Sequence, residues 1–148
     1  MSEDLSTALL LSRGVGRMLT QQGFAALTEV ALANGRRADL VALGRGGEIV
    51  IVEIKSSVAD FRSDEKWPEY REFCDRFYFA VGADFPRALI PGDCGLIVAD
   101  PFGAAILRET PPLLLPAARR RAMTLRFALL GAERLRRLTD PTADDTLL

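Results

Sequence analysis

The chain has 148 residues, of which 49% are hydrophobic and 26% are charged, and its formal net charge is −1. This length predicts a single domain, and the apolar content is sufficient for a core and excludes global disorder. The absence of histidine excludes His-based triads and zinc sites, and the nearly neutral total charge means that nucleic-acid binding would depend on local basic patches.

The first third of the chain predicts one helix followed by a three-stranded meander. Apolar residues recur at helical spacing before Gly23, which stands where a helix would end. The dipeptide Asn34-Gly35 and the segment 45–47 are typical of turns, so each is expected to separate two strands. We expect a helix over residues 4–22 and strands over residues 24–33, 39–43 and 48–54.

The rest of the chain predicts a crossover, three more strands and a C-terminal helix. Pro68 fits the first turn of a helix, and a helix between the third and fourth strands is long enough for a crossover connection. The sheet is therefore expected to be mixed, within an α/β domain that spans residues 1–140 and ends in a frayed tail over 141–148. In order, we expect a loop or short helical turn over 57–62, a helix over 63–74, strands over 76–81, 95–99 and 104–107, and a helix over 119–138.

Two carboxylates and one amine are expected to meet at the end of the meander. If the chain turns near residues 45–47, antiparallel pairing puts Asp39 opposite position 52 or 53, where paired Cβ atoms are about 5 Å apart. Glu53 and Lys55 are two positions apart on one strand, so they point to the same face. Two acids placed in this way can share one divalent cation, with the ammonium beside them.

The location of these charges indicates a function. The preceding run 49–52 is apolar on both faces, as expected for a central strand, so Glu53 and Lys55 stand where burial costs free energy unless they are partnered or functional. Phosphodiester hydrolysis would use each group, because carboxylates hold Mg²⁺, which activates water, and an ammonium stabilises developing charge. The alternative interpretation is a solvated salt-bridging face, which is the usual role of a Glu-x-Lys at a strand end.

The residues around this motif resemble a known family. Asp39 followed by Glu53-Ile54-Lys55 resembles the PD-(D/E)XK nuclease signature. The wider pattern, which covers roughly residues 20–110, is similar to the MmcB-like bacterial DNA-repair proteins. Its most specific stretches are residues 36–41, 51–62, 66–70 and 74–81. The resemblance implies a restriction-endonuclease-like fold, a central mixed β-sheet flanked by helices, and a Mg²⁺- or Mn²⁺-dependent deoxyribonuclease that acts in DNA repair.

The resemblance also implies roles for individual residues. Asp39 and Glu53 match the family's metal-binding acids, and the Ile54 carbonyl matches a further metal ligand. Lys55 matches the catalytic lysine. Glu29, on the preceding strand, is a candidate for the accessory acid, which many members carry on the first helix instead.

Two further positions extend the comparison with this family. Lys66 and Tyr70 are four apart on the expected helix and so would share a face. They resemble the Gln-x-x-x-Tyr element of some relatives, with lysine in place of glutamine. Both lysines of the chain thus stand at matched positions, although it has 17 arginines. Ala38 replaces the proline that often precedes the motif aspartate, a departure common in this fold that leaves the metal ligands in place.

Several basic and aromatic residues have both a structural and a DNA-binding interpretation. Arg36 and Arg37 follow a turn, where they either solvate the loop or contact phosphates. Trp67 and the run Phe77–Phe79 favour core packing over base stacking. The C-terminal helix carries seven arginines, which form either a solvated face or a phosphate-tracking surface. The residues expected to bind nucleic acid are Arg36, Arg37, Arg62, Lys66 and Tyr70.

Asp60, Asp64 and Asp75 are expected to be caps or surface charges, and the alternative is that one of them supports the site. Two cysteines are too few to indicate a disulfide scaffold, and Cys74 is expected to be packed. The N-terminus lacks the pattern of a signal peptide and no apolar run approaches the ~20 residues that span a bilayer, so we expect a cytoplasmic protein that does not bind membranes.

Three hypotheses about function follow from these observations. The first is a metal-dependent DNA nuclease, and the second is a DNA-binding repair accessory protein with a vestigial site. The third is a structural partner of other DNA-repair proteins, which dock on the arginine-rich helix. Because many nucleases of this fold dimerise to cut both strands, a homodimer is one expected state.

Overall fold

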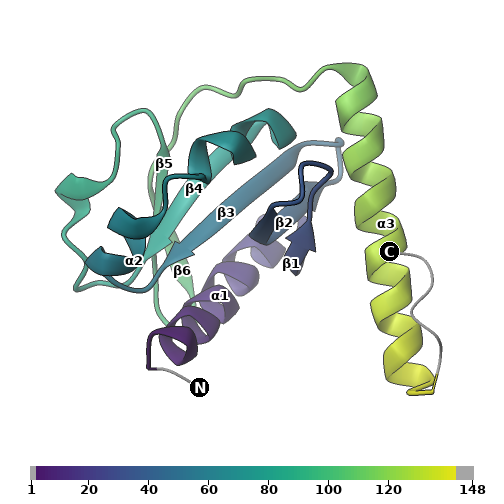
Figure 1. The fold of residues 1–148 in the computed structure, drawn as a ribbon, viewed down its shortest axis with the longest axis horizontal. Helices are drawn as coiled ribbons and strands as arrows, with labels where there is room; N and C mark the ends of the chain where they lie inside the picture. The colour runs from purple at the N-terminus through teal and green to yellow at the C-terminus, as the bar shows by residue number, and fades with distance from the viewer. Residues whose placement is uncertain (1–2, 143–148) are drawn as a thin grey trace.

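The computed structural model describes residues 3–142, with side chains described from residue 6 onward, so most of the expected tail over 141–148 lies outside the described residues. Within this range, helices flank one six-stranded sheet (Figure 1). The strands are β1 (Phe24–Ala31), β2 (Arg37–Gly44), β3 (Ile49–Lys55), β4 (Arg76–Val81), β5 (Gly95–Ala99) and β6 (Ala104–Arg108). The helices are α1 (Glu3–Gln21), α2 (Val58–Ser63) and α3 (Ala117–Thr139), and the 3₁₀ segments are η1 (Trp67–Phe73) and η2 (Arg87–Leu89).

The strands lie in the sheet in the same order as in the chain. β1, β2 and β3 form an antiparallel meander, β3, β4 and β5 are parallel, and β6 returns antiparallel to β5. The prediction of an α/β fold with a mixed sheet is therefore confirmed. Because β3 and β4 are parallel, the crossover through α2 and η1 starts at the edge of the sheet where β3 ends, next to Glu53 and Lys55.

Two apolar layers enclose the sheet. On one face, α1 packs Leu11, Val15, Met18 and Leu19 against the strands. On the other face, η1 and α3 contribute side chains that include Tyr70, Phe73 and Met123. All seven residues of β3 are buried, which confirms its central position. In the part of the chain that the structure describes, no helix combines the length and hydropathy that crossing a membrane requires.

The segment after β3 differs from the expected helix over residues 63–74. The chain instead forms α2, an extended link at Asp64 and the 3₁₀ segment η1. Ser57 is the N-cap of α2, since its hydroxyl accepts a hydrogen bond from the Asp60 N–H at 3.0 Å. Residues 58–63 thus form a short helix where the sequence predicts a loop or short helical turn, whereas the helix expected over 63–74 is replaced by the link at Asp64 and by η1.

The 3₁₀ geometry of η1 changes which residues share a face. A 3₁₀ helix has three residues per turn, so Lys66 and Tyr70, four apart, point in different directions. Lys66 is exposed, whereas Tyr70 is buried under the sheet. The prediction that these two side chains share one face is therefore wrong.

Asp75 ties α3 and its preceding segment to the sheet. Its carboxylate accepts hydrogen bonds from the Ile49 N–H at 2.8 Å, from the Leu115 N–H at 2.9 Å and from both terminal nitrogens of Arg120 at 2.6 Å. Burial by itself raises the pKa of Asp75, but these bonds, above all those from Arg120, outweigh it and lower the pKa. The expectation that Asp75 is a cap or surface charge is wrong, because its side chain is 1% exposed.

The arginines of α3 bind mainly to the protein's own atoms. Arg119 donates to the Glu72 carbonyl, Arg120 binds Asp75, and Arg126 and Arg134 donate to carbonyls of β1. Each guanidinium thereby satisfies carbonyl or carboxylate oxygens that need a donor. For these four residues the contacts favour a structural role over phosphate tracking.

Candidate active site

Asp39 of β2 and Glu53 of β3 meet, as the sequence predicts. Leu40 pairs with Val52 in the antiparallel ladder, which puts position 39 opposite position 53. The Asp39 N–H donates to Glu53 Oε1 at 3.0 Å, and the Ile54 N–H donates to Asp39 Oδ2 at 2.8 Å. Each carboxylate accepts a main-chain hydrogen bond from the opposite strand, so the two acids are held side by side.

A change of face in β2 places Asp39 at this junction. Leu40 packs in the layer with α1, whereas Ala38, two positions earlier, packs in the layer on the other face. Regular strand alternation would keep these two residues on one face. Asp39 stands at the switch between them, and its side chain turns toward the main chain of Ile54.

The neighbouring strand β1 changes face at the corresponding position. Ala26 packs in the layer with α1, whereas Val30 packs in the opposite layer. The residue between the two regular stretches is Glu29, which has a positive φ of 50°. The paired breaks in β1 and β2 therefore lie across from each other, at Glu29 and Asp39.

Burial raises the pKa of both carboxyls of the site. Glu53 is 4% exposed. Desolvation is the largest cause of its shift, and the charge of Asp39 adds to it, which raises the pKa of Glu53 to about 9. Desolvation also raises the pKa of Asp39, although the Ile54 N–H and the charge of Lys55 oppose it. At neutral pH the pair therefore retains a proton, as expected for two carboxylates in one desolvated site.

Lys55 lies beside the acids but is paired with the crossover. Its Nζ is 2.6 Å from Asp64 Oδ2 and 3.9 Å from Asp60 Oδ1, and its side chain is 6% exposed. Burial raises the pKa of Asp64, but hydrogen bonds from Lys55 and from the Lys66 N–H outweigh it and lower the pKa. Asp60 and Asp64 thus belong to the surroundings of the site. The spacing Ser57-x-x-Asp60 is a local signal for a cap, whereas no spacing in the sequence predicts that Asp64 pairs with Lys55.

A hollow of about 610 Å³ lies over these residues, between β3 and the crossover. Arg37 and Tyr70 also line it, so two of the residues expected to bind nucleic acid are at the site. The Tyr70 hydroxyl donates to the Arg37 carbonyl at 3.0 Å, and burial, together with the nearby charges of Glu53 and Asp39, raises the pKa of Tyr70.

The structure leaves the other expected DNA-binding residues outside this hollow. Arg36 Nε forms an ion pair with Glu69 Oε2 at 2.6 Å. Arg62 and Lys66 are exposed and are not among the residues that line the hollow. None of these three side chains is paired with Asp39, Glu53 or Lys55 among residues 6–142, and the expected role of the three residues in DNA binding stays a prediction.

Glu29 lies near Asp39 without completing a three-acid cluster. A second hollow of about 330 Å³, on the α1 side of Asp39, is lined by Thr28, Glu29 and Ile54 among others. Among the side chains described, those of residues 6–142, however, no three His, Cys, Asp or Glu gather closely enough to hold a metal ion. The accessory role expected for Glu29 stays a prediction.

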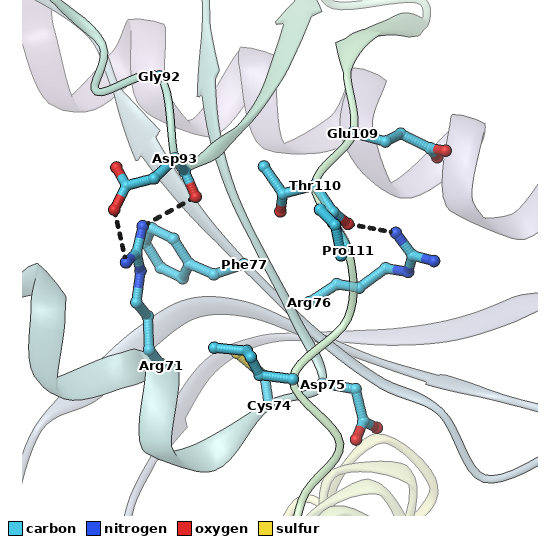
Figure 2. A pocket seen from close by; sticks show the side chains of 11 residues that line it. Arg71, Cys74, Asp75, Arg76, Phe77, Gly92, Asp93, Glu109, Thr110 and Pro111 are labelled. Atoms are coloured by element: carbon cyan, nitrogen blue, oxygen red, sulfur yellow. Dashed lines mark hydrogen bonds and ion pairs between the residues drawn. The ribbon is translucent and has the colours of Figure 1, made fainter.

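A further hollow of about 540 Å³ lies at the amino end of β4 (Figure 2). Two arginines flank it, and both are held by the protein itself. Arg71 NH1 is 3.1 Å from Asp93 Oδ2, and Arg76 NH1 donates to the Thr110 carbonyl at 2.7 Å. None of the acids or lysines expected in the site lines this hollow.

The raised pKa of Glu53 predicts that the metal-free protein loses stability as the pH rises. The folded state keeps a proton on Glu53 that the unfolded state releases above pH 4.5. The contribution of this proton to stability is therefore lost progressively between pH 4.5 and about pH 9. The free energy of unfolding should fall by up to about 1.4 kcal/mol per pH unit in this window. Urea unfolding in chelator would measure the slope, which Glu53→Gln should flatten. An equal slope in the two proteins would contradict the shift.

Fold and site together define an α/β protein whose central strand ends in a buried glutamate and a buried lysine, beside an aspartate of the neighbouring strand. A family model described as DNA repair protein MmcB-like matches residues 2–142. The chain belongs to the MmcB-like family of DNA repair proteins. This membership supports a role in DNA repair and points to DNA as a partner.

A solved structure shares this architecture. It is described as SPO1766, a protein of unknown function from Silicibacter pomeroyi, and it is 42% identical to this chain. The TM-score is 0.91, and the match covers 96% of this chain and 97% of that chain. The search of curated proteins found no match.

Proposed function

We propose that this protein is a metal-dependent deoxyribonuclease of the PD-(D/E)XK superfamily, which hydrolyses phosphodiester bonds in DNA repair. The observation that carries the proposal is the convergence of Asp39, Glu53 and Lys55 at one end of the central strand. Their order and spacing resemble the superfamily signature, and the mixed sheet with a helical crossover is compatible with its fold. Membership in a DNA-repair family favours DNA as the substrate.

The donor atoms of the site fit Mg²⁺ or Mn²⁺. Asp39 and Glu53 supply carboxylate oxygens, and the Ile54 carbonyl is the further candidate ligand. Hard divalent cations take oxygen ligands and keep several waters, so few protein ligands suffice. The proton retained by the pair also fits, because a cation would compensate two desolvated carboxylates. When bound, such an ion neutralises phosphate charge and lowers the pKa of a water.

The other residues around the hollow have distinct roles in this proposal. Lys55 orients the attacking water or stabilises charge on the phosphoryl oxygens, which requires that its ammonium exchange Asp64 for the substrate. Arg37 contacts a phosphate at the rim. Tyr70 holds the main chain at Arg37 through its hydrogen bond to the carbonyl. It therefore acts through Arg37 and not by contact with the substrate.

Lys55→Ala is expected to reduce Mg²⁺-dependent nicking about a hundredfold while DNA binding persists. The ammonium would act on charge that develops in the transition state, and loss of one such donor has effects of this size. Plasmid nicking and binding to a labelled duplex would be measured for both proteins. Arg87→Ala is the control, since Arg87 is an exposed basic residue of η2 away from the hollow. Nicking by Lys55→Ala at the rate of the unmodified protein would contradict the assigned role.

The second candidate is a DNA-binding repair accessory protein with a vestigial site. One observation favours it: the groups that hydrolysis would need already have partners within the protein. Lys55 is paired with Asp64, and the pair Asp39 and Glu53 keeps a proton. Salt-sensitive DNA binding without cleavage in Mg²⁺ or Mn²⁺ would support this candidate over the first. Docking of other repair proteins on α3 and formation of a homodimer also stay predictions.

A further inference from the structure

Glu29 has an unusual backbone conformation in the middle of β1. Its φ of 50° lies in the left-handed region, and it is the one non-glycine residue with positive φ in the described part of the chain. The adjacent pairs Thr28–Leu40 and Val30–Ala38 place it directly across from Asp39. Such a conformation persists only where surrounding contacts impose it.

Arg134 of α3 supplies contacts at this position. Its NH1 donates to the Thr28 carbonyl at 2.5 Å, and its NH2 donates to the Glu29 carbonyl at 2.8 Å. A guanidinium is planar and holds its donors in a rigid fork, so one side chain fixes the directions of two successive carbonyls. β1 is an edge strand, and α3 stands beside it (Figure 1).

The left-handed conformation at Glu29 is linked to the acid pair through β2. β1 and β2 change face at the same cross-strand position, so the conformation of Glu29 and the orientation of Asp39 are parts of one break. Asp39 then accepts the Ile54 N–H and donates its own N–H to Glu53. A continuous series of hydrogen bonds and strand pairs therefore joins α3 to the carboxylates.

We propose that Arg134 is a positioning residue of the acidic site. Its guanidinium holds Glu29 in the left-handed backbone conformation, and this conformation keeps Asp39 oriented toward Glu53 and Ile54. The catalytic relevance of this role rests on the proposed function, whereas the geometric effect does not. Through Arg134, α3 therefore helps to set the geometry of the site, although it does not line the hollow.

Arg126 provides a matched control on the same helix. It lies about two turns before Arg134 and donates to the Ala31 carbonyl at 3.2 Å. It contacts the same strand through the same kind of bond, but beyond the break. A general loosening of α3 would follow from either substitution, whereas a change at the acid pair is expected from Arg134→Ala alone.

Amide hydrogen exchange of the metal-free protein measures this difference. The Ile54 and Asp39 amides are the reporters, because they donate to the two site carboxylates. Arg134→Ala is expected to speed their exchange about tenfold relative to Arg126→Ala, with the amides between β4 and β5 unchanged. Equal exchange of the two reporters in both variants, or faster exchange throughout the sheet, would overturn the proposal.

A rescue experiment tests whether Arg134 acts through the turn. Glycine adopts positive φ without steric cost, so in Glu29→Gly the left-handed conformation at position 29 should depend less on the hydrogen bonds from Arg134. In that background, Arg134→Ala is expected to change exchange at Ile54 and Asp39 less than twofold. An undiminished effect in the glycine background would show that Arg134 does not act by holding Glu29, and the inference would be wrong.

Mn²⁺ titration separates this inference from the proposed function. If the site holds metal, Arg134→Ala should weaken Mn²⁺ binding about tenfold, as loss of a group that orients a metal ligand does. If the unmodified protein binds no Mn²⁺, the metal-dependent nuclease is wrong. The exchange of Ile54 and Asp39 still decides the role of Arg134 in that case.

Discussion

Glu53→Gln is expected to abolish divalent-metal binding and to lower DNA cleavage by about a thousandfold or more. A carboxamide cannot become an anion, so the site loses the charge that would hold the cation and with it several kcal/mol of transition-state stabilisation. Glutamine has the shape of glutamate and keeps an oxygen that accepts the Asp39 N–H, so the fold is expected to persist. Calorimetric titration with Mn²⁺ and a plasmid-cleavage assay would measure the two effects.

A matched control is available for this substitution. Glu65→Gln makes the same chemical change at an exposed position in the link between α2 and η1. It should leave metal binding and cleavage unchanged. If Glu53→Gln still cleaves DNA at the original rate, the metal site proposed at Asp39 and Glu53 is wrong.

Asp75→Ala is expected to lower the free energy of unfolding by about 3–5 kcal/mol. The substitution removes the acceptor for the Ile49 and Leu115 N–H groups and leaves the Arg120 guanidinium without its carboxylate. Water replaces the bonds of the Ile49 and Leu115 N–H groups poorly, because both residues are buried. Urea unfolding followed by circular dichroism would measure the loss.

Asp93→Ala is the corresponding control on the surface. Asp93 forms an ion pair with Arg71 at 3.1 Å, but its side chain is 71% exposed. Exposed ion pairs contribute little to stability because water screens them, so the loss should be several times smaller than for Asp75→Ala. Similar losses for the two variants would mean that Asp75 does not anchor α3 as the contacts indicate.

The parts of the fold that depend on local pattern were predictable from the sequence. The apolar run before Glu53 indicates a central strand, and turns around β2 set a register that brings Asp39 opposite position 53. Strand alternation then places Lys55 beside the acids. These inferences need only spacing along the chain, which is why they agree with the structure.

The parts that depend on distant contacts were not predictable in this way. Asp64 binds Lys55 only because α2 ends where it does, and Asp75 is buried only because α3 returns over it. Gly14 is a similar case: a Cβ there would lie 1.9 Å from the Asp100 carbonyl oxygen. Glycine therefore allows α1 to approach the connection between β5 and β6. In the sequence, the same glycine only weakens the expected helix.

The contact between Arg134 and β1 also bears on the order of events during synthesis. Arg134 follows Glu29 by 105 positions, and α3 is the last of the elements that the structure describes. A nascent polypeptide cannot make this contact until α3 has left the ribosome. The meander can form earlier, but its acid pair reaches its final arrangement only after α3 has emerged.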